Sequence, residues 1–187
     1  MVRLRQTKFE PGLAQPNQVR ECADCAPTSA QPWRRAIDAS NLASIGRHAR
    51  DRFAGLYHVT ARSNAEEHIF RDDRDYLAGI QILAGLVGGR LLVCHQFCFM
   101  PTHYHLLATF QEAQLSGTIH RLNRRYASGF NRRHGRRGRV FDGPFASVPV
   151  IEQEHLLWVT KYIADNPSRR PWPYSSADDD FGFIDLL

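Results

Sequence analysis

Two histidines stand one residue apart in the segment CFMPTHYHLL, which spans residues 98–107. Residues two apart on a β-strand point to the same face of the sheet, so we expect His103 and His105 to project together and Tyr104 to project to the other face. Neighbouring imidazoles on a rigid strand can bind a metal ion. For an isolated pair of this kind, exposed or buried structural histidines are the commoner outcome. The pair therefore gains weight only from its surroundings.

An arginine-rich segment follows this pair along the chain. It contains no acidic residue between Glu112 and Asp142. Its arginines alternate with apolar and aromatic residues, a composition that suits phosphate contacts combined with base stacking. This pattern favours a nucleic-acid surface over a merely solvated basic face. The candidate nucleic-acid-binding residues are Arg121, Arg124, Arg125, Arg132, Arg133, Arg136, Arg137 and Arg139.

Tyr126 lies in the middle of the arginine-rich segment. It shares a helical stripe with Ile119 and Leu122, and this spacing by itself favours an aromatic side chain packed on a sheet. A tyrosine can also act as a nucleophile when surrounding positive charge offsets its ordinary pKa of ~10. The residues alone leave both interpretations open. Trp158 and Tyr162, one turn apart on a later predicted helix, are interpreted as core residues.

Composition limits the kinds of partner. The chain has 187 residues, 43% of them hydrophobic, which suits one main domain. Its net charge of +5 and pI near 9.3 indicate an anionic partner. No apolar run approaches the ~20 residues that span a bilayer, and the polar start of the chain lacks a signal-peptide core. We therefore expect a soluble cytoplasmic protein with no membrane partner.

Hydrophobic periodicity predicts an α+β fold. The helix over 73–86 is expected to have Asp73 as its N-cap, and the hairpin is expected to turn at Pro101 and Thr102. Within the second strand, Cys94 and Cys98 are expected to face the same side. The element order is typical of an antiparallel sheet with helices packed on one face. The predicted strands span 56–63, 90–100, 103–110 and 145–151, and the predicted helices span 73–86, 115–130 and 154–166.

Four sequence blocks, taken together and in order, resemble the REP-associated tyrosine transposases. This family is related to the bacterial insertion-sequence transposases that have an HUH motif and one catalytic tyrosine. The resemblance covers about residues 46–176 and implies a ferredoxin-like, HUH endonuclease type of antiparallel sheet sandwich. The blocks are YHVTARSN (57–64), FCFMPTHYHLL (97–107), LNRRYASGFNRRHGRRGRVFDGPF (122–145) and KYIADNP (161–167).

The resemblance implies a chemistry as well as a fold. His103 and His105 match the HUH pair and would bind one divalent ion, Mg²⁺ or Mn²⁺, with Asn131 as a further ligand. Tyr126 matches the nucleophile. Attack of its phenol on the scissile phosphate of single-stranded DNA would give a 5′-phosphotyrosine link and a free 3′-hydroxyl. The expected activity is thus a metal-dependent endonuclease and strand transferase, acting at hairpin-forming repeats.

Domain organisation and partners follow from the same reasoning. Residues 1–45 are expected to form a loosely ordered extension, 46–176 the HUH transposase-like catalytic domain, and 177–187 an acidic tail. The expected partner is single-stranded or hairpin DNA, bound by a monomer or a homodimer. The alternative is a non-catalytic binding protein for structured single-stranded nucleic acid. Formation of a covalent protein–DNA adduct would distinguish the enzyme from the binding protein.

Overall fold

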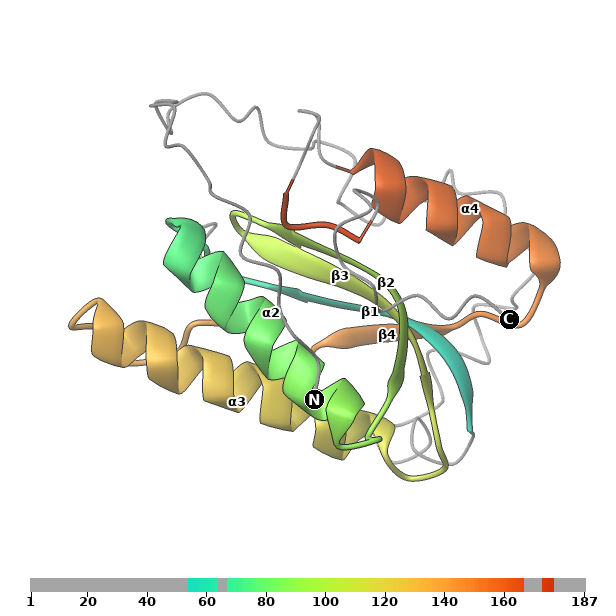
Figure 1. Cartoon of the computed structure of the whole chain (residues 1–187), viewed down its shortest axis with the longest axis horizontal. Helices are drawn as coiled ribbons and strands as arrows, with labels where there is room; N and C mark the ends of the chain where they lie inside the picture. Colours follow the sequence, from blue (N-terminus) through green and yellow to red (C-terminus); the bar gives the residue numbers. More distant parts are fainter. Residues whose placement is uncertain (1–53, 64–66, 167–172, 177–187) are drawn as a thin grey trace.

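The computed structural model describes residues 54–63, 67–166 and 173–176, so the predicted extension over 1–45 and the predicted tail over 177–187 lie outside the described residues (Figure 1). Within the described part, the predicted α+β class and the predicted order of elements are confirmed. The elements are β1 (Gly55–Arg62), α2 (Asp73–Gly88), β2 (Val93–Met100), β3 (His103–Phe110), α3 (Leu115–Arg133), β4 (Ala146–Pro149) and α4 (Gln153–Asp165).

The four strands form one sheet in the order β2-β3-β1-β4, and each neighbouring pair is antiparallel. β2 and β3 form the predicted hairpin, which turns at Pro101 and Thr102. Three backbone N–H groups hold this turn: that of Ser63 donates to the Thr102 carbonyl, and those of Ile69 and Phe70 donate to the Pro101 carbonyl. The histidine pair, which begins directly after the turn, therefore starts from a fixed backbone.

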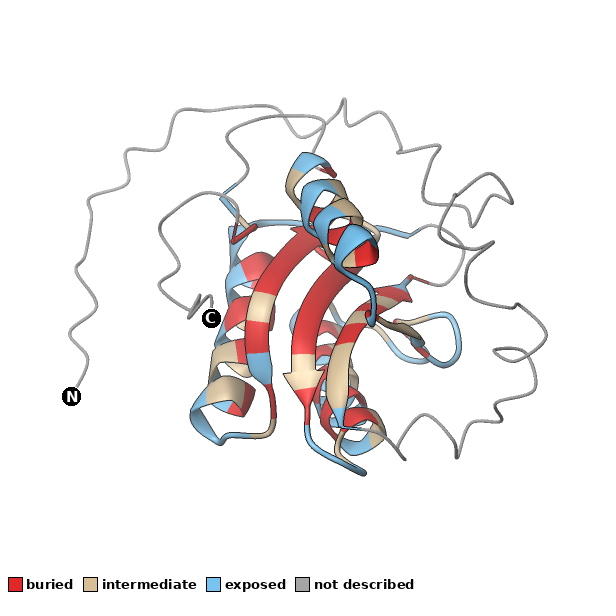
Figure 2. Ribbon diagram, turned by 90° about the vertical axis from the view of Figure 1, so that its right-hand side faces the viewer, coloured by how far each residue is buried: buried red, intermediate tan, exposed pale blue. Residues whose placement is uncertain are grey.

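Helices cover both faces of the sheet. α2 and α3 pack on one face, over a core that includes Val59, Phe97 and Leu106. α4 lies on the opposite side (Figure 1), where Val159 and Ile163 pack on Cys98, Met100 and Leu107. The predicted packing of all helices on one face is therefore wrong for α4. The physical reason is visible in Figure 2: β2 and β3 are buried over most of their length, which requires cover on both faces.

A β-bulge changes the direction of side chains in β2. The register against β3 shifts between Cys94 and Gln96. As a result Cys94 belongs to the core beneath α2 and α3, whereas Cys98 faces α4. The prediction that these two cysteines share a face is wrong, because a bulge inserts one residue into the alternation. Beyond the bulge, the Gln96 side-chain N–H donates to the Thr160 carbonyl at 3.2 Å and ties β2 to α4.

Candidate active site

His103 and His105 project from β3 toward α4, as the two-residue spacing predicts. Their ring centroids are 5.0 Å apart with an interplanar angle of 89°. His105 is buried and His103 is half-buried. Tyr104, between them, points to the other face and packs in the core beneath α2 and α3. The expectation that the two imidazoles share one face is therefore confirmed.

Both imidazoles are uncharged at neutral pH. Burial lowers the pKa of His103 to about 4, with the Arg62 guanidinium as a second cause. Burial also lowers the pKa of His105 well below its ordinary value, and His58, His103 and Arg62 add to the effect. Among the described residues, Nε2 of His105 has no hydrogen-bond partner although it is buried. A buried, unsatisfied ring nitrogen calls for an explanation, and a metal ligand is one.

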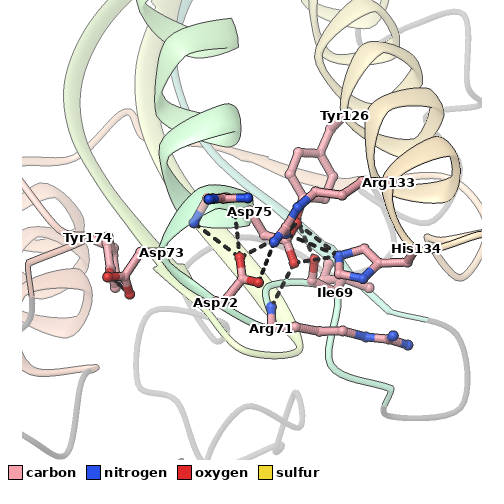
Figure 3. Close-up of polar contacts among 10 residues, drawn as sticks. Ile69, Arg71, Asp72, Asp73, Asp75, Tyr126, Arg133, His134 and Tyr174 are labelled. Carbon is pink, nitrogen blue, oxygen red and sulfur yellow. Dashed lines mark hydrogen bonds and ion pairs between the residues drawn. The ribbon is translucent and has the colours of Figure 1, made fainter. Parts of the chain in front are cut away.

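Tyr126 does not lie near the histidine pair. It is 4% exposed, on the face of the sheet that α2 and α3 cover, and its ring centroid is 4.7 Å from that of Phe70. Its hydroxyl donates a hydrogen bond to the Ile69 carbonyl (Figure 3). Burial, followed by the nearby Asp75 carboxylate, raises the pKa of this phenol. The sheet separates Tyr126 from His105, so within this chain the structure does not bring the phenol that the resemblance implies as nucleophile to the histidine pair. The packed aromatic residue favoured by helical spacing is what the structure shows.

Asn131 also lies away from the histidine pair. It lies on α3, and its side-chain N–H donates to the Gly138 carbonyl at 2.9 Å. This hydrogen bond closes the loop that follows the helix. α3 packs on the opposite face of the sheet from His103 and His105, so the structure does not bring Asn131 together with the two predicted metal ligands.

The tyrosine that does contact the histidines is Tyr162 on α4. Its ring centroid is 5.2 Å from that of His105 at an interplanar angle of 87°, and 6.1 Å from that of His58 at 73°. The adjacent Ile163 is fully buried against the sheet and anchors the helix, whereas Tyr162 is half-buried. Trp158, one turn earlier, stacks on the phenol ring at 4.9 Å and 9°. Trp158 and Tyr162 both pack against the core beneath α4, as predicted, and Tyr162 in addition lies beside two imidazoles.

Asn166 follows Tyr162 by four residues, directly after α4, which is the spacing of neighbours on one side of a helix. It is 6% exposed, and within the described ranges neither its side-chain nitrogen nor its oxygen has a hydrogen-bond partner. An amide oxygen is a suitable ligand for a hard cation. The described residues contain no group of three or more His, Cys, Asp or Glu side chains that could hold a metal ion.

A sequence signal for this arrangement existed. Tyr162 and Asn166 both fall in the KYIADNP block, four residues apart at the end of a predicted helix and just before Pro167. A polar pair at helical spacing, next to the proline that ends the helix, is a recognisable pattern. His58 likewise falls in the YHVTARSN block, and strand alternation places its side chain on the opposite face from those of Tyr57 and Val59.

The predicted arginines lie on α3 and the loop after it, away from α4. Arg133 forms ion pairs with Asp72 and Asp75, and Arg136 pairs with Glu67 (Figure 3 for Arg133). These carboxylates compete with phosphate for the two guanidinium groups. The other predicted arginines are exposed, and they are Arg121, Arg124, Arg125, Arg132, Arg137 and Arg139.

The same cluster of charges fixes the start of α2. The N-cap is Asp72 and not the predicted Asp73, because the Asp72 side chain accepts hydrogen bonds from the N–H groups of Arg74 and Asp75. Hydrogen bonding from Arg133 lowers the pKa of Asp72. Asp73 instead accepts a hydrogen bond from the Tyr174 hydroxyl at 2.5 Å (Figure 3).

An antiparallel sheet with helices on both faces defines the architecture, and solved structures resemble it. One is a REP-associated tyrosine transposase bound to a REP hairpin, with 16% identity, 67% of this chain and 79% of that chain covered, and a TM-score of 0.54. Another is a transposase-like protein from Deinococcus radiodurans R1, with 14% identity, coverage of 59% and 89%, and a TM-score of 0.45. No family model and no curated protein matches the sequence. The first likeness confirms the predicted resemblance at the level of the fold.

None of the helices in the described part of the chain is long and apolar enough to cross a membrane.

Proposed function

We propose that this protein is a metal-dependent endonuclease and strand transferase of the transposase type, acting on single-stranded DNA at hairpin-forming repeats. One observation carries the proposal: the Tyr162 ring lies against His105, on the face of the sheet that also presents His103. The fold shared with the transposase solved with a REP hairpin supports the same substrate class.

His103, His105 and Asn166 would hold the divalent ion, Mg²⁺ or Mn²⁺. The donor set fits, because both imidazoles are uncharged and the buried atoms His105 Nε2 and Asn166 Oδ1 lack partners within the described ranges. A hard cation prefers oxygen ligands, so water and phosphate oxygens would complete its shell. When bound, the ion would act as a Lewis acid on the scissile phosphate.

Tyr162 would be the nucleophile in place of Tyr126. Its phenolic oxygen attacks phosphorus, a new P–O bond to the tyrosine forms, and the bond from phosphorus to the 3′ oxygen breaks. The phenol loses its proton and the 3′ oxygen gains one, which leaves a 5′-phosphotyrosine link and a free 3′-hydroxyl. One phosphoester replaces another, so the strand can be rejoined without ATP.

The exposed arginines of α3 would bind DNA phosphates on the other side of the sheet from Tyr162. Because of this separation, we expect them to contact a part of the substrate distant from the scissile phosphate. Arg133 and Arg136 should contribute less to binding than the sequence predicts, since carboxylates already neutralise them.

The test is an adduct assay with a labelled DNA hairpin that has a single-stranded flank. The label belongs at the 3′ end, because the fragment that carries the 5′-phosphate stays on the protein. With Mn²⁺ we expect a labelled band that migrates with the denatured protein, and peptide mapping should place the DNA on Tyr162. EDTA should remove the band, and a 5′-label should appear only on a shortened free strand. Hairpin binding with no adduct would contradict the proposal and support the non-catalytic alternative.

A further inference from the structure

His58 on β1 makes a direct contact with the proposed metal ligand His105. Its Nε2 lies 3.0 Å from Nδ1 of His105, and the two rings stack at 5.3 Å with an interplanar angle of 23°. His58 also packs edge-on against the Tyr162 ring at 6.1 Å. One side chain that the resemblance does not assign therefore touches both the ligand and the proposed nucleophile.

We propose that His58 is a positioning residue that fixes the tautomer and the ring orientation of His105. The inference rests on the proposed function only for the identity of what His105 binds. In a neutral imidazole one ring nitrogen carries a hydrogen and the other carries a lone pair. The direction of the hydrogen bond between the two rings therefore determines which nitrogen of His105 carries the hydrogen. If Nδ1 of His105 donates to His58, then Nε2 of His105 keeps its lone pair and can ligate an ion. If His58 donates instead, Nε2 of His105 carries a hydrogen and cannot ligate.

The surroundings favour the first arrangement. Nε2 of His105 is buried with no partner among the described residues, and an N–H there would be an unsatisfied buried donor. With a lone pair at that atom, a cation can satisfy it. Histidine ligands commonly donate their second ring N–H to a neighbouring acceptor that holds the ring in place. His58 would then be that acceptor, with its own hydrogen on Nδ1.

The backbone holds the acceptor firmly. β1 is an interior strand, paired with β3 on one side and β4 on the other, and His58 is in register with Leu107 and Val148. Thr60, the next residue of β1 on the same face, is directly opposite His105. A positioning group works best on a rigid element, because a shift of about 1 Å can misplace the ligand.

Two substitutions separate positioning from packing. His58→Gln keeps an acceptor, the amide oxygen, at about the reach of Nε2, whereas His58→Phe keeps the ring but removes the acceptor. The readouts are the tautomer of His105 by ¹⁵N NMR of the metal-free protein and the affinity for Mn²⁺ alone by calorimetry. His95→Gln is the matched control, since His95 on β2 bonds Thr109 at 2.8 Å and does not take part in the pair.

We expect the Nδ1–H tautomer of His105 in the wild type, in His58→Gln and in His95→Gln. His58→Phe should lose that preference and bind Mn²⁺ about 10- to 100-fold more weakly, while hairpin binding persists. A wild-type His105 protonated on Nε2 would overturn the inference, and so would an unchanged tautomer and affinity in His58→Phe. Should His58→Phe fail to fold, the wild-type and His58→Gln tautomers decide the question. A wild type that binds no Mn²⁺ would contradict the proposed metal site, while the metal-free tautomer would still test His58.

Discussion

Tyr126 on α3 and Tyr162 on α4 should respond in opposite ways to the loss of a hydroxyl group. In Tyr126→Phe the Ile69 carbonyl loses its donor in a site where the tyrosine is 4% exposed. An unsatisfied buried acceptor costs about 1–3 kcal/mol. At roughly 4 °C per kcal/mol for a domain of this size, the melting temperature should fall by about 4–12 °C. Adduct formation below that temperature should continue.

In Tyr162→Phe the ring, its stack on Trp158 and its packing against His105 all remain. Because Tyr162 is half-buried, we expect a change in stability within about 1 kcal/mol. The attacking oxygen is gone, however, so the covalent adduct should fall below detection. Hairpin binding should persist, because the exposed arginines lie elsewhere.

The assay compares three proteins at one temperature well below every melting point. Thermal unfolding, hairpin binding and the yield of the denaturation-resistant adduct are measured on the same samples, with the 3′-labelled strand and Mn²⁺. An adduct that persists in Tyr162→Phe would refute the assignment. So would a Tyr126→Phe variant that melts and binds DNA like the wild type but forms no adduct.

Three further predictions concern the ion, the DNA and the charge cluster. Asn166→Leu should weaken Mn²⁺ binding, measured by calorimetry, by more than about 10-fold. It should leave the melting temperature unchanged or raised, because it removes buried polar atoms that have no partners in the described part of the chain. An unchanged Mn²⁺ affinity would exclude Asn166 as a ligand. Exchanging Arg124 and Arg125 for Gln should make DNA binding less dependent on salt: the slope of the logarithm of the binding constant against the logarithm of the salt concentration should fall by about 0.7–0.9 for each DNA phosphate that is no longer neutralised. Arg133→Gln should mainly lower the melting temperature, because Arg133 pairs with Asp72 and Asp75. The reverse result would contradict the division between arginines that bind DNA and arginines that pair with carboxylates. The lowered pKa of Asp72 means that its stabilisation is fully present at neutral pH and declines as the pH falls below the ordinary carboxyl pKa toward the lower folded-state pKa. Asp72→Ala should therefore lower the melting temperature most at pH 7, and the difference from the wild type should shrink steadily as the pH is lowered below about 4. A difference that does not change with pH would exclude the ionised carboxylate as the cause.

Local patterns predicted the elements and the direction of the histidine pair. Strand alternation has a period of two regardless of what lies on either side, so His103 and His105 could be placed on one face without knowing the fold. The same rule failed for Cys94 and Cys98, because a bulge lies before Gln96. A bulge depends on how β2 pairs with β3, so it could not be recognised in the sequence of β2 by itself. Period rules hold only as far as the strand stays regular.

The face that each helix covers could not be predicted from its own sequence. Tyr126 and Tyr162 both sit beside buried apolar residues at helical spacing, and a helical stripe indicates burial without naming the face of the sheet. The arginines around Tyr126 suggested a phosphate site, but the structure uses Arg133 to hold α2 through Asp72 and Asp75. The run of arginines in the sequence thus pointed to α3, the helix proposed to bind DNA, and gave no information about Tyr162, the proposed nucleophile on α4.

The energetics of α3 argue against Tyr126 reaching the histidine pair by any movement of the helix. Burying one large apolar side chain contributes about 1.5–3 kcal/mol, so the apolar row on this helix contributes on the order of 10 kcal/mol. That row is Leu115, Ile119, Leu122, Tyr126 and Phe130. Whole domains are stable by only about 5–15 kcal/mol, so lifting α3 around the edge of the sheet would unfold the protein. Tyr162, by contrast, already contacts His105 without any movement of a helix.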